Sequence, residues 1–407
     1  MKLAILGTRG VPPRYGGFET FAAELGRRLV ARGHEVSVYC RDVIPSVSEG
    51  PGGPGGASGV PSARPGPSTT LGMTTWEGMH RIVLPSIGHK YLETVSHALL
   101  SALDALRRDF DAVLVCNAAN AFVLPILRAA RIRVAINVDG IERNRRKWNI
   151  LGKMVYAIGE SFSAAFANAV IADANVIADY YRKTYAIDPI TIPYGSEFPE
   201  EADSDVLQRL GLRAKEYLLY VSRFEPENNP LEVVEAYEKY LGARREARGA
   251  GKTPLAPRAP RLAPPLVMLG EARYDKQLAT ALHNHASDKI LFPGALYGAD
   301  YRTLQRNALL YIQATEVGGT HPALIEGMAS NGCVLAHDTP ENREVGEDAV
   351  GYFKLRPAET LSGTLSDWLA SPDLRQMQIG KARQRTAERY SWEAVTGAYE
   401  EILLGLV

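Results

Sequence analysis

The first 42 residues of the chain constrain its fold more than any other stretch. Residues 3–6, LAIL, form a short apolar run, and a loop rich in glycine and proline, GTRGVPPRYGG, follows it. Apolar residues then recur at helical spacing from Phe18 to Leu29, Gly33 ends this helix, and residues 35–40 supply a second strand. This order predicts a parallel sheet that binds a ligand at the carboxyl ends of its strands.

Strands and helices go on alternating in two sets. The first set has expected strands at 80–85, 112–116, 133–140, 169–173 and 190–195, and helices at 94–108, about 121–130, 150–168 and 175–185. After the acidic stretch EFPEEADSD, the second set has strands at 217–224, 266–270, 290–294, 309–315 and 333–338, and helices that include 230–241 and 300–308. A chain of 407 residues exceeds what one core usually serves. We expect two Rossmann-like α/β domains, 1–195 and 196–388, that face each other across a cleft, and a final helix at 389–407 that packs back on the first.

Two segments do not follow this alternation. Residues 44–72 and 242–265 are rich in Gly, Pro, Ser or basic residues and have few apolar groups to offset the entropy of ordering them. We expect a mobile insertion at each place. No aromatic residue lies among the basic residues of the second segment, which argues against a nucleic-acid-binding arm.

Charge and cysteine content exclude several classes of protein. Lys plus Arg and Asp plus Glu number 46 each, so no overall field attracts nucleic acid or a membrane. Cys40, Cys116 and Cys333 lie far apart in apolar runs, which predicts buried, inert thiols. No apolar stretch reaches 18 residues, and the apolar run at the start is too short for a signal sequence. A cytoplasmic protein is expected.

The first loop could hold a phosphate. Gly7, Gly10, Gly16 and Gly17 border a helix start, where free N–H groups and the helix dipole favour an anion. Glycine is also the usual residue of tight turns, so a purely structural loop is the alternative.

A dinucleotide site is a weaker interpretation of the same region. Pro12 and Pro13 stand where the G-x-G-x-x-G pattern needs its third glycine and helix. Asp42, expected just after the second strand, is the residue type that holds a ribose in such sites, and it keeps an NAD-linked hypothesis open.

Two places in the second half could act on a sugar nucleotide. Arg223, at the end of an expected strand, could neutralise a phosphate with its planar fork; a structural ion pair is the alternative. Further on, Gly318 and Gly319 precede a helix that begins near residues 320–322 and carries one acid, Glu326. A carboxylate can accept hydrogen bonds from both hydroxyls of a ribose. A solvated helix residue is the alternative, but the apolar neighbours of Glu326 predict a buried helix whose acid needs a partner.

Several stretches together resemble a known family. GTRGVPPRYGGFET, VDGIERNRRKW, YVSRFEPENNPLEVVEAY, GGTHPALIEGMASNGCVLAHDTPENREVG and YSWEAVTGAYEEIL, in this order, are similar to retaining nucleotide-sugar glycosyltransferases of the GT-B fold, of the group 1 and family 4 type. The bacterial rhamnosyltransferase-like group looks closest, and the resemblance covers nearly the whole chain apart from the two insertions. It implies transfer of a hexose or deoxyhexose, with rhamnose favoured, from a dTDP- or UDP-linked donor. The acceptor would be a saccharide, in particular a lipid-linked one, in cell-surface polysaccharide synthesis.

The resemblance also implies roles for residues. Glu326 would hold the donor ribose and Arg223 the donor diphosphate. The other residues expected to bind the donor are Gly16, Gly17, Arg9, Asn228, Gly318, Gly319, Thr320 and His321. Asn228 replaces a usual lysine and Gly318 a usual glutamate, which suggests a greater part for Arg9 and a sugar with fewer hydroxyls.

The implied reaction needs few catalytic side chains. Arg223, helix N–H groups and Arg9 would stabilise the departing diphosphate without a metal or cofactor. Asp139, at a strand end, is the expected catalytic residue besides Arg223 and would orient the acceptor or the sugar; a turn-capping residue is the alternative.

The acceptor is expected to contact Glu19, Arg143 and Arg146. The cationic run from Arg143 to Trp148 would also suit an anionic bilayer surface, and a solvated helix face is its alternative. A sugar-nucleotide epimerase, an NAD-linked oxidoreductase and a non-catalytic nucleotide-sugar binder are the rival functions.

Overall fold

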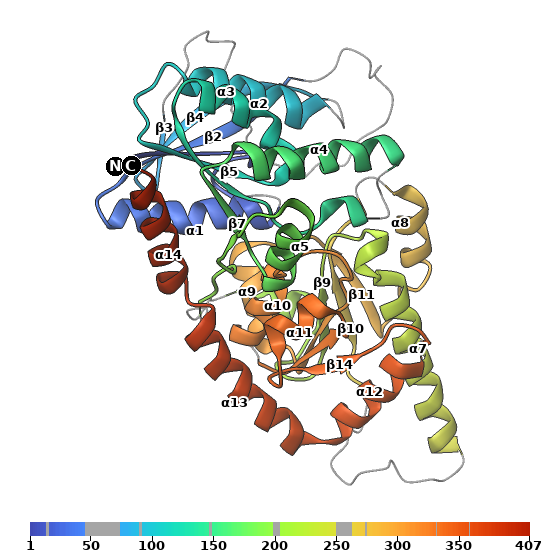
Figure 1. The fold of residues 1–407 in the computed structure, drawn as a ribbon. Coiled ribbons are helices and arrows are strands. Elements are labelled where there is room, and N and C mark those ends of the chain that lie inside the picture. The colour runs from blue at the N-terminus through green and yellow to red at the C-terminus, as the bar shows by residue number, and fades with distance from the viewer. Residues whose placement is uncertain are drawn as a thin grey trace. The chain divides into compact units, whose positions relative to one another are not determined.

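The chain folds into two compact units (Figure 1). The computed structural model describes residues 1–13, 16–44, 74–88, 92–145, 149–197, 204–249, 263–272, 275–330, 332–357 and 359–407. Unit 1 comprises Met1–Val138, Ile158–Val170 and Tyr399–Val407, and unit 2 comprises Asp139–Ala157 and Ile171–Ala398. Residues 45–72 of the first expected insertion and 250–262 of the second lie outside the described residues.

An eight-stranded sheet has the order β3-β4-β2-β1-β5-β6-β7-β8. Its strands are β1 Lys2–Leu6, β2 Glu35–Ile44, β3 Thr74–Trp76, β4 Met79–Ile87, β5 Ala112–Cys116, β6 Arg133–Asn137, β7 Ala169–Ala172 and β8 Ile190–Thr191. Strand β1 pairs in parallel with β2, as the first 42 residues predicted, and on its other side with β5. The apolar runs of β1 and β5 are almost wholly buried. Parallel sheets that are covered on both faces favour such runs.

The sequence did not predict the β3–β4 hairpin. Its strands pair antiparallel around Glu77 and Gly78, which both have positive φ, so these two residues form the tight turn that joins them. Asp42 lies inside β2 and not just after it. The strand expected at 133–140 ends at Asn137, because Asp139 adopts a left-handed φ of 58° that a strand cannot accommodate.

Helices connect these strands. They are α1 Gly17–Ala31, α2 Leu92–Ala105, the 3₁₀ helix η1 Ala118–Val123, α3 Leu124–Ala129, the 3₁₀ helix η2 Glu142–Asn144, α4 Ile150–Phe166 and α5 Asn175–Tyr185. The helix expected at 121–130 is divided into η1 and α3. Asn117 begins η1, where its side chain accepts a hydrogen bond from Ala119 N, and proline stands in the first turn of α3.

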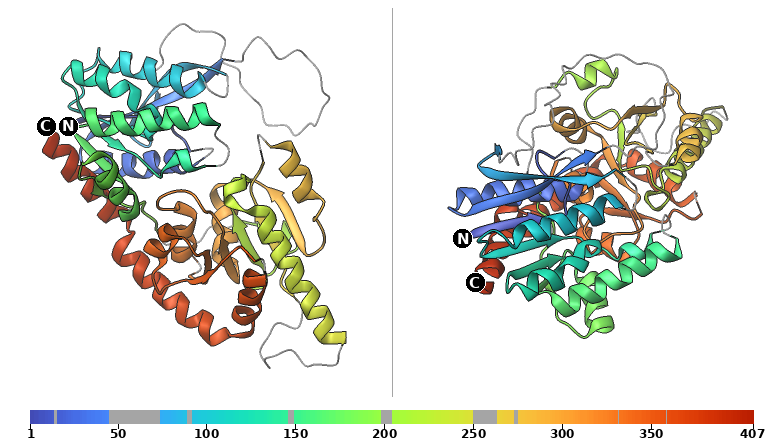
Figure 2. Two further views of the ribbon diagram at one scale, coloured as in Figure 1. Left: turned by 45° about the vertical axis from the view of Figure 1, so that its right-hand side comes forward. Right: turned by 90° about the horizontal axis from the view of Figure 1, so that it is seen from above.

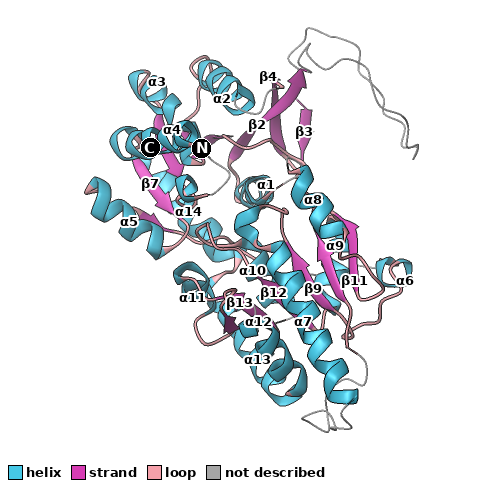
Figure 3. Ribbon diagram, turned by 90° about the vertical axis from the view of Figure 1, so that its right-hand side faces the viewer, coloured by secondary structure: helices cyan, strands magenta, loops and turns pink. Residues whose placement is uncertain are grey.

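A six-stranded parallel sheet in unit 2 has the order β11-β10-β9-β12-β13-β14. Its strands are β9 Leu218–Val221, β10 Leu266–Leu269, β11 Ile290–Gly294, β12 Leu310–Gln313, β13 Val334–His337 and β14 Gly351–Phe353. The order places β9 in the middle, as in a doubly wound fold, so helices are needed on both faces. Figure 3 shows the strands of this sheet between helices.

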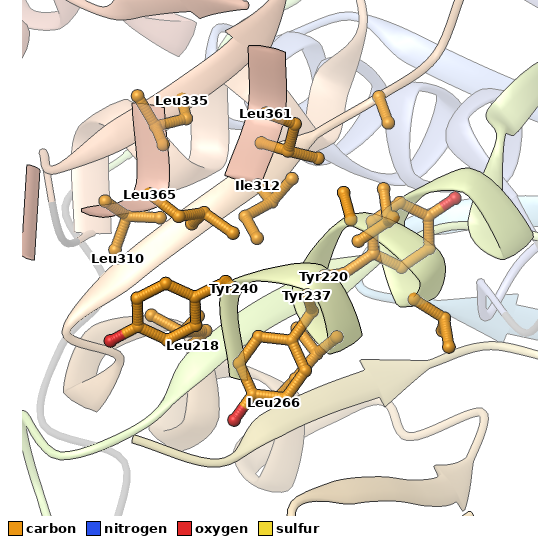
Figure 4. Close-up of a cluster of buried hydrophobic side chains, with 14 of the residues drawn as sticks. Leu218, Tyr220, Tyr237, Tyr240, Leu266, Leu310, Ile312, Leu335, Leu361 and Leu365 are labelled. Carbon is orange, nitrogen blue, oxygen red and sulfur yellow. The ribbon is translucent and has the colours of Figure 1, made fainter. Parts of the chain in front are cut away.

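The remaining helices lie in unit 2, except for the end of α14, which belongs to unit 1. They are α6 Val206–Arg209, η3 Pro226–Asn228, α7 Pro230–Gly249, α8 Lys276–His283, α9 Gly298–Asn307, α10 Pro322–Ser330, α11 Pro340–Gly346, α12 Glu359–Ala370, α13 Pro372–Arg389 and α14 Trp392–Leu406. Helix α7 runs eight residues beyond the expected end at Leu241, because residues 242–249, GARREARG, are mostly good helix formers. The core of this unit joins sheet residues such as Leu218 and Ile312 to Tyr237 and Tyr240 of α7 (Figure 4).

The last residues of α14 pack within unit 1, where both chain ends lie near each other (Figure 2). The Tyr399 ring lies 5.1 Å from the Phe21 ring, and its hydroxyl accepts a hydrogen bond of 2.6 Å from Asn137 Nδ2. Tyr399 is 0% exposed and Asn137 is 1% exposed. This contact ties the C-terminal turns to α1 and to the end of β6.

Tyr399→Phe should lower stability, because it removes a buried hydrogen-bond acceptor while it keeps the ring. The expected cost is about 1–3 kcal/mol, seen as a lower melting temperature in scanning calorimetry. Tyr297→Phe is the matched control, because the Tyr297 side chain is exposed. Equal melting temperatures for the two variants would show that this contact does not stabilise the protein.

Candidate active site

Two stretches that the sequence singled out meet through their backbones. Asp139 follows the end of β6 in the left-handed region, and Gly140 comes next. A Cβ atom on Gly140 would lie only 2.6 Å from Gly318 C and 2.7 Å from Gly319 N. No side chain fits in this space, so position 140 requires a glycine where the Asp139 loop contacts the glycine stretch, Gly318 and Gly319.

Asp173, directly after β7, holds the glycine stretch from a second direction. Its Oδ2 accepts a hydrogen bond of 2.9 Å from Thr320 N, and its main-chain oxygen accepts one from Thr320 Oγ1. A Cβ atom on Gly319 would lie 1.9 Å from Asp173 Oδ1, which is buried without a hydrogen-bond partner among the described residues. Asp173 was not among the residues predicted from the sequence. The signal available was an acid at the carboxyl end of a predicted strand, the same position that drew attention to Asp139.

His321 faces this stretch in a defined tautomer. Its Nδ1 lies 2.9 Å from the Asn342 Oδ1 acceptor, so Nδ1 carries the proton and Nε2 carries a lone pair. Burial lowers the pKa of His321, so the ring is neutral. A Cβ atom on Gly318 would lie 2.4 Å from Nε2. The ring thus presents an acceptor against the glycine stretch.

Arg145 lies in the same region, within a group of acids. Its Nε donates to Glu142 Oε1 at 2.6 Å. Its Nη1 lies 3.6 Å from Glu225 Oε2 and 3.5 Å from Glu227 Oε1. Arg145 is 7% exposed and Glu227 is 0% exposed. From the sequence, Arg145 was expected in a cationic run that is solvated or faces a ligand. That expectation was wrong, because Arg145 is buried and forms ion pairs with Glu142, Glu225 and Glu227.

The charges around Asp139 are closely coupled. Burial, and after it the Glu142 carboxylate, raises the pKa of Asp139 to about 6, while the positive charges of Arg145 and Arg223 oppose the rise. Burial and then the charge of Asp139 raise the pKa of Asp173 well above its usual range. Two buried carboxylates whose charges repel each other, such as Asp139 and Asp173, are not both easily ionised. The site can therefore hold or release a proton near neutral pH.

Arg223 and Asn228 lie at the carboxyl end of β9. The Arg223 side chain is 44% exposed, and its Nη1 lies 3.9 Å from Glu225 Oε1. The Asn228 amide Nδ2 donates to Arg223 O at 2.6 Å, so this side chain shapes the turn that presents the arginine. A guanidinium at a strand end that keeps access to solvent is suited to bind an anion.

Glu326 has the internal partner that its surroundings predicted. It lies on α10, and its Oε2 accepts a hydrogen bond from the Tyr301 hydroxyl. Burial, and after it the Glu326 charge, raises the pKa of Tyr301 well above its usual range, so the tyrosine stays a donor. Because Glu326 is only half-buried, this bond orients the carboxylate without covering it.

Four further predicted residues belong to unit 1. Gly16 and Gly17 begin α1, and Glu19 Oε1 accepts from Arg9 N at 3.2 Å. Glu93 accepts a hydrogen bond from each of two arginines, with 3.3 Å to Arg9 Nη2 and 3.2 Å to Arg41 Nη1. Burial raises the pKa of Glu19. The sequence did not single out Arg41 or Glu93, which lie on a strand and a helix without a motif.

Of the two remaining residues expected to contact the acceptor, the structure describes Arg143 but not Arg146. The Arg143 guanidinium lies 5.2 Å from the centre of the Tyr180 ring and donates to its hydroxyl. Arg146 lies outside the described residues. Among the described residues no group of three or more His, Cys, Asp or Glu side chains is placed to hold a metal ion.

The chain matches two models of glycosyltransferase families. Residues 15–195 match the family model Glycosyltransferase Family 4, and residues 207–385 match Glycosyl transferases group 1. No curated protein matches the sequence at a significant level.

Solved structures are similar over the whole chain. Sucrose-phosphate synthase from Thermosynechococcus elongatus aligns with a TM-score of 0.75 at 16% identity, covering 100% of this chain and 98% of that one. Anabaena HepE in complex with UDP aligns at 0.68 and 13% identity, covering 100% of both chains. A trehalose-phosphate synthase from Burkholderia xenovorans in complex with glucose-6-phosphate aligns at 0.71 and 11% identity, covering 99% of this chain and 100% of that one. These likenesses and the two sheets confirm the predicted GT-B fold, and the chain belongs to the GT-B glycosyltransferases, with a Family 4 part followed by a group 1 part.

Proposed function

We propose that the protein transfers a hexose or deoxyhexose, with rhamnose favoured, from a dTDP- or UDP-linked donor to a saccharide acceptor, with retention at the anomeric carbon. The observation that carries the proposal is the convergence in unit 2 of Asp139, the end of β9 at Arg223, and the glycine stretch that leads into α10. These features would offer one ligand a cation, the positive end of a helix dipole and a carboxylate.

The donor nucleotide would bind along this line. The half-exposed Arg223 would pair with the diphosphate, and the positive end of the α10 dipole favours the same charge. Glu326, oriented by Tyr301, would accept hydrogen bonds from the ribose hydroxyls. The similar Anabaena structure holds UDP, which supports a nucleotide as the ligand of this fold.

Two substitutions relative to the wider family bear on the sugar. The amide of Asn228 is engaged with Arg223 O, so the usual lysine charge is not replaced there. Gly318 offers no carboxylate, and the neutral His321 presents only an acceptor beside it. A donor sugar with fewer hydroxyls than glucose fits this loss of one acid, which favours a deoxyhexose.

The reaction would break the bond between the anomeric carbon and the diphosphate oxygen. The acceptor hydroxyl oxygen would bond to the same face of that carbon, and its proton would pass to an oxygen of the departing phosphate. Asp139 would orient the acceptor hydroxyl as a hydrogen-bond acceptor. Each well-placed donor on the leaving group contributes about 3 kcal/mol, so Arg223 and the positive end of the α10 dipole would support the step without a metal.

Contact with a membrane surface would bring a lipid-linked acceptor to the site. In the sequence, α4 comes shortly after Arg146 and Lys147. The helix exposes Ile150, Met154 and Ile158 on one face. Apolar side chains on one face beside basic residues favour the surface of an anionic bilayer. Among the described residues no helix is both long and apolar enough to cross a membrane.

The donor assignment is tested with Arg223→Ala and Glu326→Gln. Each should weaken binding of dTDP-rhamnose about 10- to 100-fold in calorimetry, because one loses a charge on the diphosphate and the other a ribose partner. Arg182→Ala is the control, since the Arg182 side chain is as exposed as that of Arg223 and pairs with Asp179 and Asp188. Wild-type turnover of donor and acceptor should persist in EDTA. Unchanged binding by both site variants would contradict the assignment, and donor isomerisation without an acceptor would indicate an epimerase.

Asp139 predicts an acid limb in the rate profile. If its ionised form orients the acceptor, kcat/KM should fall as the pH drops below about 6, where Asp139 gains a proton. The folded pKa lies above the ordinary value of 3.8. The folded state therefore favours the protonated carboxyl of Asp139. The contribution of this group to stability is complete below pH 3.8 and is lost as the pH rises through about 6.

Asp139→Asn should thus lower kcat strongly at pH 7.5 yet raise, or leave unchanged, the melting temperature at that pH. A variant that melts earlier and keeps its rate would contradict the role of Asp139.

The membrane proposal is tested with an Ile150→Glu/Met154→Glu variant. Wild type should sediment with vesicles that contain phosphatidylglycerol, and the variant about 5-fold less, because two charges replace exposed apolar side chains that would insert into the bilayer. Met377→Glu, an exposed methionine of α13, is the matched control. Equal sedimentation of all three proteins, or none by wild type, would contradict this contact surface.

A further inference from the structure

The transfer scheme assigns no role to Arg145, a buried cation. Arg145 lies among the carboxylates of Glu142, Glu225 and Glu227, on three sides of its guanidinium. Burial alone would lower the pKa of Arg145, but the nearby acids outweigh it and raise the pKa, so the side chain is always charged. Such a group is costly to build, because each charge must leave water.

The acids need this arginine. Glu227 is 0% exposed, and neither of its carboxylate oxygens forms a hydrogen bond among the described residues. Its contact with Arg145 Nη1, at 3.5 Å, is an ion pair without a hydrogen bond. Arg145 therefore supplies the positive charge that compensates the buried carboxylate of Glu227.

Glu225 connects Arg145 to the donor site. One of its oxygens, Oε2, lies 3.6 Å from Arg145 Nη1, and the other, Oε1, lies 3.9 Å from Arg223 Nη1. The carboxylate thus spans two guanidinium groups. The Arg223 side chain is half-exposed and long, so an untethered Arg223 would lose more rotamer freedom when it binds a ligand. A tether that is itself fixed by a buried arginine lowers that loss.

Arg145 also acts on Asp139. The titratable and charged groups that face Asp139 come from its own loop, from the ends of β7 and β9 and from α4, and they are Glu142, Arg145, Arg223, Asp173 and Tyr156. Three of these, Glu142, Asp173 and Tyr156, are neutral or negative. The two arginines are the counter-charges in this group, and Arg145 is the buried one.

We propose that Arg145 is a positioning residue of the transfer site, which fixes Arg223 through Glu225 and supplies the counter-charge beside Asp139. It does not itself touch the donor. This inference rests on the proposed transfer reaction and adds a second layer to it. It differs from a purely structural ion pair because it predicts changes in donor affinity and in pH dependence that loss of stability cannot produce.

The central test compares Arg145→Gln with wild type. Affinity for dTDP-rhamnose should fall about 10-fold, because Glu225 no longer holds Arg223 in place. The acid limb of kcat/KM should move upward by about one pH unit, because Asp139 loses its buried counter-charge. Arg145→Lys should restore the limb but not the affinity, since an ammonium keeps the charge without the planar fork.

Three further variants distinguish the effect of Arg145 on Arg223, through Glu225, from its effect on Asp139. Glu225→Gln should reproduce the affinity loss and leave the acid limb in place, because Arg145 still faces Asp139. Arg145→Met/Glu227→Gln should recover melting temperature without recovering affinity. Arg385→Gln is the control for a structural arginine: Arg385 donates to Val345 O and Glu344 O, and its loss should lower the melting temperature and change neither readout.

The outcomes are distinct. Arg145→Gln with wild-type affinity and an unmoved acid limb would overturn the inference, as would full recovery of both by the Arg145→Met/Glu227→Gln variant. If wild type neither binds the donor nor transfers sugar, the proposed function fails instead. The two failures cannot be confused, because the first requires an active wild-type protein.

Discussion

The backbone contact of Gly140 with Gly318 and Gly319 is the constraint on which the candidate site depends. It places the loop after β6 directly on the entry to α10, with no room for a side chain. Asp173 fixes the same entry through two hydrogen bonds to Thr320. Segments that are 147 residues apart in the sequence are thereby held within hydrogen-bonding distance. Rigid backbone of this kind is what a phosphate site needs, because N–H groups must stay aimed at the anion.

Buried charge is the second organising feature, and it follows from the first. The Asp139 loop carries Glu142 and Arg145 into the interior, where carboxylates and arginines compensate one another and leave the pKa of Asp139 at about 6. Such an arrangement does little for stability, since desolvation offsets most of the attraction. Its value lies in a fixed geometry and in a carboxylate that changes its charge near neutral pH. The exposed Arg223 is then the part of the network that remains available to a ligand.

Local sequence predicted the fold well and the site only partly. The repeated order of strand, glycine loop and helix predicted both sheets. A strand that is buried on two faces needs a continuous apolar run, and such runs marked β1 and β5. Glu326 and Arg223 could be singled out as candidates because each comes after a recognisable turn. Arg145 was misjudged, since a cationic run is usually solvated and only tertiary contacts with Glu225 and Glu227 reveal otherwise. Asp173 was missed for the same reason: its importance comes from Thr320, which no spacing rule connects to it.

The most direct measurement is calorimetric binding of dTDP to Gly140→Ala, with Gly363→Ala as control. A Cβ atom at Gly363, on α12, meets nothing within 4 Å, so the control should bind as wild type does. If the backbone contact builds the donor site, the methyl group at position 140 must push the two stretches apart, and dTDP affinity should drop at least about 10-fold. Nucleotide binding by Gly140→Ala as tight as that of wild type would contradict the account.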